Sequence, residues 1–171
     1  MYLDFIELSG SRPCPAEPGK MIITGKPARA LEEVIPYLAC LPNVIGFNPE
    51  TSILTLRRQP GFITIFPKKI HITQVRDVDE GLELLEALKD AINAVWEKRQ
   101  ELVAVTKRTN TMRPLDIYAH LPQTNCKLCG EATCLAFAHM LFMRKRLITE
   151  CLPLQEKRIH SDHKAALEAM L

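Results

Sequence analysis

The sequence lacks long apolar runs and the common nucleotide-binding or hydrolytic motifs, and we do not expect its first residues to be a secretory leader. No stretch reaches the roughly 18 uninterrupted apolar residues that indicate a membrane span. The opening MYLDFIELSG carries acidic residues within its apolar run and has no basic segment, unlike a signal peptide. There is no P-loop, no G-x-G-x-x-G and no Ser–His–Asp cue. We therefore expect a cytoplasmic protein, in which thiols stay reduced.

Strong charge of one sign is also missing. The formal net charge is +2, which is too small to indicate a nucleic-acid partner by itself. The charge is uneven along the chain: residues 1–104 carry 12 Lys and Arg against 14 Asp and Glu, and residues 105–171 carry 10 against 6. The C-terminal part is therefore the basic one.

Short β-branched runs dominate the first half of the sequence. They are separated by turn residues rich in proline, as in an antiparallel meander. The run IHITQV alternates, so His71 and Thr73 are expected to face water. The predicted strands are 20–25, 43–47, 52–58, 61–66 and 70–75.

Two helices are expected beside these strands. One runs from Pro27 to about residue 40, with a kink or break at Pro36. The other spans about 80–103 and has apolar residues at helical spacing. The order predicts an α+β fold with a ferredoxin-like type of antiparallel sheet and both helices on one face. We divide the chain into an α+β domain (1–104), a linker (105–114) and a small, mainly helical module (115–171).

The stretch TNCKLCGEATC places three cysteines within nine residues and raises the question of a fourth ligand. One completion, C-x2-C-x4-C-x4-H, would add His139 and has the gap lengths of a zinc knuckle that binds nucleic acid. The other, C-x2-C-x4-C-x16-C, would add Cys151 and suits an iron–sulfur cluster. The apolar helix expected over 135–148 and the few aromatic residues nearby favour the second and make nucleic acid the less favoured partner.

The segment from Leu121 to Pro153 resembles the four-iron domain of the corrinoid iron–sulfur protein large subunit. It is also similar to the iron–sulfur subunit of the Rnf-type ion-pumping oxidoreductases. Lys127 and Leu152 depart from those families, which usually have glycine after the first cysteine and proline after the last. The shared residues are Leu121, Pro122, Asn125, Cys126, Cys129, Gly130, Cys134, Phe137, Ala138, Cys151 and Pro153.

The resemblance implies a [4Fe–4S] cluster bound by Cys126, Cys129, Cys134 and Cys151. It further implies a low-potential one-electron carrier in the corrinoid or one-carbon metabolism of an anaerobe. The partner would be a redox protein, such as a corrinoid protein or a ferredoxin-type donor. A chain with one cluster and no second cofactor is expected to be an accessory protein and not an enzyme. A structural or sensory cluster is the remaining alternative, and the sequence carries no signal for an oligomeric state.

Four other features have simpler expectations. Cys40 is expected to be buried and Cys14 to lie in an exposed loop between Pro13 and Pro18. His160 and His163 are expected on the solvated face of a C-terminal helix. Residues 144–146, Arg-Lys-Arg, form either a solvated helix end or a docking patch for an acidic electron partner.

Overall fold

The computed structural model describes residues 1–14, 17–156 and 160–171. Its centre is a seven-stranded antiparallel sheet in the order β1-β2-β6-β5-β4-β3-β7. The strands are β1 (Ile6–Pro13), β2 (Met21–Pro27), β3 (Val44–Asn48), β4 (Ile53–Arg57), β5 (Phe62–Ile65), β6 (Ile70–Val75) and β7 (Thr109–Asn110). The helices are α1 (Ile35–Leu38), α2 (Val78–Glu97), α3 (Pro114–Tyr118), α4 (Cys134–Phe142), the 3₁₀ helix η1 (Ile148–Glu150), α5 (Leu152–Gln155) and α6 (Ser161–Met170).

The predicted α+β class, with an antiparallel sheet, two helices and a small helical C-terminal part, is confirmed. Strands β3 to β6 form the expected meander, and each pairs with the next along the chain. Strand β1 was not predicted, and β7 forms within the segment proposed as a linker. The division into two domains and a linker remains a prediction. Within the described residues, no helix is both long and apolar enough to cross a membrane.

The first predicted helix is much shorter than expected. Strand β2 runs through Pro27, and α1 comprises only Ile35–Leu38. Pro36 lies in the first turn of α1, where its missing N–H costs nothing, so it starts the helix and does not interrupt it. Helix α2 forms at Val78–Glu97, close to the predicted range, and the Asp77 side chain accepts a hydrogen bond from the Glu80 N–H at its start.

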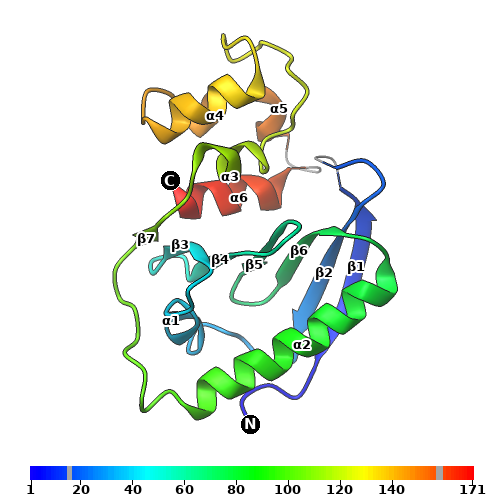
Figure 1. Cartoon of the computed structure of the whole chain (residues 1–171), viewed down its shortest axis with the longest axis vertical. Coiled ribbons are helices and arrows are strands. Elements are labelled where there is room, and N and C mark those ends of the chain that lie inside the picture. The colour runs from blue at the N-terminus through cyan, green and yellow to red at the C-terminus, as the bar shows by residue number, and fades with distance from the viewer. Residues whose placement is uncertain (15–16, 157–159) are drawn as a thin grey trace.

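The two faces of the sheet carry different residues. On one face, apolar side chains such as Phe47, Leu54 and Ile72 pack against α1 and α2 in the larger core. The other face is rich in polar side chains, namely Thr55, Thr64, His71 and Thr73, all of them buried. The C-terminal helices cover this polar face, and Figure 1 shows them on the side of the sheet opposite α2.

This covering corrects the expectation that His71 and Thr73 face water. Only 6% of His71 and 9% of Thr73 is exposed. Alternation along a strand indicates that two faces differ in polarity, but it does not show whether a later helix covers the polar one.

Helix α6 approaches the sheet closely because of a glycine. A Cβ at Gly46 of β3 would lie 2.6 Å from Cγ of Met170. Asp162 of α6 adds an ion pair with Lys69 Nζ at 2.5 Å and a polar contact with His71 Nδ1 at 3.5 Å. The C-terminal part is therefore held against the sheet by both packing and charge.

A second charged contact joins α3 to the sheet. Arg57 of β4 donates a 2.6 Å hydrogen bond to Asp116, which is almost fully buried and also accepts from the Arg113 N–H. Burial raises the pKa of Asp116, but the hydrogen bonds from Arg57 and Arg113 outweigh that effect and hold the pKa below its usual value.

We expect Asp116→Ala to lower the Tm by roughly 5–10 °C, because it leaves the partly buried Arg57 guanidinium without its carboxylate. Asp90→Ala is the control: its carboxylate is 71% exposed and pairs with Lys89 at the surface, so its Tm should change by less than about 2 °C. Thermal melts under nitrogen measure both. Equal shifts in the two variants would show that the Arg57–Asp116 contact does not hold α3 to the sheet.

Candidate metal centre

Two segments supply the four predicted cysteine ligands. The loop between α3 and α4 carries Cys126 and Cys129, and Cys134 is the first residue of α4. Cys151 lies between η1 and α5. Cys134 and Cys151 belong to one apolar core cluster, against which Cys129 packs.

The pKa of Cys151 reflects both its burial and the other three candidate thiols. Burial raises its pKa, and thiolate charge on Cys134, Cys129 and Cys126 raises it further. All three partners therefore lie within electrostatic range of Cys151. Cysteines bind metals as thiolates, so four of them acting as ligands would need a cationic group to offset their mutual repulsion.

The cysteine loop has an unusual backbone. Gln123, Asn125 and Lys127 have positive φ values of 57°, 50° and 61°, and Gly130 has a φ of 86°. Such conformations turn successive N–H groups toward the inside of a loop, where they can hold an anion. The Leu128 N–H donates to the Cys126 sulfur in this way and, with the Thr124 side chain, lowers the pKa of Cys126.

Asn125 fixes the start of α4 beside this loop. Its side-chain oxygen accepts a 2.8 Å hydrogen bond from the Cys134 N–H. Its own N–H points back to the Cys134 sulfur at 3.4 Å. Thr133 caps the helix by accepting from the Ala136 N–H at 3.0 Å. Cys134 is thereby held by both its backbone and its side chain.

Arg146 connects the two cysteine-bearing segments. Its guanidinium contacts Glu131 of the loop at 3.1 Å and Glu150 of η1 at 2.8 Å. Glu150 immediately precedes Cys151, so this bridge ties the loop to the position of the fourth thiol. Arg146 is a positioning residue that the sequence alone did not reveal.

The zinc-knuckle completion through His139 finds no support in this arrangement. His139 is exposed, whereas Cys134 is buried in the core. Five residues along an α-helix correspond to about 140° of rotation, so the two side chains leave α4 in different directions. Helix α4 itself ends at Phe142, earlier than the predicted residue 148.

The donor set suits an iron–sulfur cluster. All six cysteines are free, and the four candidates lie in one region with N–H groups directed at two of the sulfurs. Among the described residues, no three His, Cys, Asp or Glu side chains stand in an arrangement for a single metal ion.

The predicted burial of the two remaining cysteines was wrong in both cases. Cys14 is buried, with its N–H bonded to the Lys20 carbonyl at 2.8 Å. Cys40 is exposed, and its thiol donates to the Val103 carbonyl at 2.9 Å. Strand β1, which ends at Pro13, carries Cys14 into the fold, and this strand was missed from the sequence.

Comparison with known proteins bears on this same segment. Residues 121–153 match the model of a family described as "Putative Fe-S cluster". The match supports an iron–sulfur cofactor in this segment. The match begins at Leu121 and ends at Pro153, the limits of the resemblance seen in the sequence.

Several archaeal proteins are similar to part of the chain. The acetyl-CoA decarbonylase/synthase complex subunit gamma 2 of Methanosarcina thermophila is 48% identical over 58 residues, which are 34% of this chain and 12% of that protein. The corresponding gamma subunit of Methanocaldococcus jannaschii is 39% identical over 54 residues, 32% of this chain and 11% of that protein. The chain therefore spans about an eighth of these relatives. No solved structure matches the chain.

These relatives overturn one expectation. The sequence suggested an accessory protein that is not an enzyme, whereas the matched relatives are subunits of an enzyme complex. The expectation was wrong because it judged enzyme activity from the number of cofactors in one chain. An enzyme can distribute its cofactors over several subunits.

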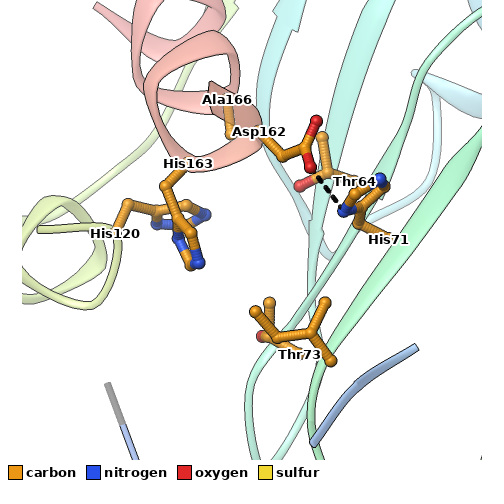
Figure 2. Close-up of a pocket in the computed structure, with 8 residues that line it drawn as sticks. Thr64, His71, Thr73, His120, Asp162, His163 and Ala166 are labelled. Atoms are coloured by element: carbon orange, nitrogen blue, oxygen red, sulfur yellow. Dashed lines mark ion pairs between the residues drawn. The ribbon is translucent and has the colours of Figure 1, made fainter. Parts of the chain in front are cut away.

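A second cluster of titratable groups lies between the sheet and the C-terminal helices. Four of the five histidines are buried, which corrects the expectation that His160 and His163 lie on a solvated face. A cavity of about 10 Å³, with room for about one water molecule, lies beside His71, His120 and His163. Figure 2 shows these imidazoles around the cavity, with His71 directed at Asp162.

The buried imidazoles of this cavity are neutral. The Nδ1 of His120 lies 2.9 Å from the Asp116 carbonyl and must donate to it, which leaves Nε2 as an acceptor. No described group bonds to Nε2 of His71, His120 or His163. Burial lowers the pKa of His71 to about 4 and that of His163 to about 3. The charged groups facing this cluster are Asp162 of α6, Lys69 beside β6 and Arg12 of β1.

We expect acid to destabilise the fold through these histidines. Because their pKa values are depressed in the folded state, their stabilisation is complete above the unfolded value of about 6.5 and is lost as the pH falls toward 4 and 3. Each proton taken up only by the unfolded chain contributes a slope of about 1.4 kcal/mol per pH unit. Thermal melts between pH 7 and pH 5 measure the effect.

A matched pair of variants tests whether a buried histidine causes this dependence of stability on pH. His163→Gln removes a buried titrating group and should flatten the dependence of Tm on pH. His139→Gln removes an exposed imidazole and should leave the slope of the wild type. If both variants keep that slope, His163 is not its source.

Proposed function

We propose that Cys126, Cys129, Cys134 and Cys151 bind one [4Fe–4S] cluster and that the chain transfers single electrons at low potential. The process it serves is acetyl-CoA or one-carbon chemistry in an anaerobe. The observation that carries the proposal is the gathering of four free thiols from two segments within a matched iron–sulfur domain.

The bound cluster would supply reversible one-electron chemistry. The protein residues around it have separate tasks. Cys134 and Cys151 hold the inner side of the site, because both are buried. Cys126 is exposed and Cys129 partly so, which leaves the outer side within reach of a partner protein. The Leu128 and Asn125 N–H groups stabilise negative charge on sulfur.

The proposed partners are a ferredoxin-type donor and a corrinoid protein that receives the electron. The second rests on the resemblance of residues 121–153 to the corrinoid iron–sulfur protein large subunit. We further propose that residues 1–104, the α+β part, recognise a partner, with 105–114 as linker and 115–171 as the cluster module.

We expect about four irons and four sulfides per chain in protein purified without oxygen, with a broad visible absorbance that dithionite bleaches reversibly. Cys151→Ser should lose most of this iron, because it removes a ligand that no neighbouring thiol can replace. Cys40→Ser is the control and should keep the wild-type content, because Cys40 bonds to Val103 away from the module.

Three results would contradict the proposal. Stoichiometric zinc without iron would indicate a zinc protein, in which His139→Ala and not Cys151→Ser should release the metal. Full iron content in Cys151→Ser would remove this residue from the ligand set. A cluster that dithionite cannot reduce reversibly would be structural or sensory.

A further inference from the structure

Most of the exposed large apolar side chains of the described residues lie in the cluster module. Among the described residues, eleven large apolar side chains are exposed, and seven of them lie between residues 115 and 152. Part of this surface borders a groove of about 430 Å³ between the end of α4, η1 and the end of α6. Its apolar floor consists of Leu141, Leu147, Ile148 and Leu171. Such a concentration is typical of an interaction site.

Positive charge borders this groove. Arg144 and Arg146 line it, and Lys145 between them is exposed. Arg146 is paired with Glu131 and Glu150, whereas the side chains of Arg144 and Lys145 form no hydrogen bond or ion pair with any described residue. Glu168 is the one carboxylate in the lining, and Lys164 lies 3.9 Å from it. The groove therefore has one unpaired cation, Arg144, in its lining, and a second, Lys145, is the next residue in the chain.

The backbone fixes the position of Arg144. Helix α4 ends with the Lys145 N–H bonded to the Met140 carbonyl and the Arg144 N–H bonded to the Leu141 carbonyl. These two bonds form a Schellman motif, in which the residue at the position of Arg144 takes a left-handed conformation. Arg144 does so with a φ of 55°, where glycine is usual. An arginine in this strained position suggests that its side chain has a role.

The groove adjoins the cysteine loop. Arg146 forms its wall and contacts Glu131 of the loop and Glu150 next to Cys151. A molecule in the groove would therefore lie beside the segments that carry the candidate ligands.

We propose that the groove docks an acidic protein electron carrier, which places an apolar side chain on the floor and carboxylates against Arg144 and Lys145. This inference rests on the proposed function, because it names the partner of the same cluster. Charge favours this occupant over a second copy of the chain. A two-fold dimer through the groove would bring Arg144 and Lys145 of both copies together, and like charges repel.

The test is binding of an acidic two-cluster ferredoxin to the full chain, by calorimetry under nitrogen at low and high salt. We expect the Kd to rise with salt and to be about fivefold to tenfold higher in Arg144→Asn and in Leu147→Gln. Asparagine tolerates the left-handed conformation, so the first variant should keep the end of α4 intact. Leu147 is 67% exposed, so the second should leave the core unchanged.

Lys98→Gln is the matched control. Lys98 follows α2 and is exposed at the end of that helix distant from the module in Figure 1, so its loss removes the same charge away from the groove. Its Kd should equal that of the wild type. Absence of binding, or equal weakening by Lys98→Gln, would overturn the docking proposal. So would a dimer that Leu147→Gln dissociates, since the groove would then be an interface between copies.

Measuring electron transfer distinguishes the docking proposal from the proposed function on which it rests. In stopped-flow mixing with the reduced ferredoxin, one electron leaves the ferredoxin and reduces the bound cluster. Arg144→Asn should slow this step, whereas dithionite should reduce variant and wild type at equal rates. Groove-dependent binding by a chain without iron would refute the proposed function alone. Iron and reversible reduction with groove-independent binding would refute the docking site alone.

Discussion

The contact of α6 with the polar face of the sheet is the interaction on which the arrangement of the cysteines depends. Thr64 and His71 would be solvated on an open sheet, yet both are buried beneath this helix. Burying such groups is costly unless they find partners. Asp162 supplies a partner by facing His71, Lys69 and Arg12 from the helix. The helix is therefore held in place by charge as well as by apolar packing.

Part of this structure was predictable because the responsible signals are local. Strands β3 to β6 follow from β-branched runs separated by prolines, and Val78–Glu97 follows from its helical periodicity. The cysteine segment was also recognisable, since an apolar helix was expected from residue 135 and α4 begins at Cys134. Ligand spacing is a property of the chain and needs no knowledge of the tertiary fold.

The errors concern residues whose environment is set by distant segments. His71 and Thr73 have the pattern of a solvated face, and distant segments cover them, namely α6 some 90 positions later and His120 after α3. Cys14 and Cys40 reversed their expected burial, because strand β1 was missed and the helix before Cys40 is short. Arg146 was grouped with its neighbours as a basic run, although it alone is paired with two carboxylates. Sequence shows residue type, whereas tertiary contacts decide which one of three similar cations is paired and which two are not.

The cysteine-bearing segment is also too small to form its own core. Its helices α4 and α5 have nine and four residues, and an isolated unit of that size buries little apolar surface. The core around Cys134 and Cys151 is completed by Ile45 and Phe62 of the sheet and by Leu167 and Met170 of α6. These four residues lie outside the segment that matches the iron–sulfur family. The matched segment supplies the thiols, and the sheet and α6 supply the packing that holds two of them inside the protein. A change at Gly46 that displaced Met170 would therefore disturb the surroundings of the cysteines without touching any proposed ligand.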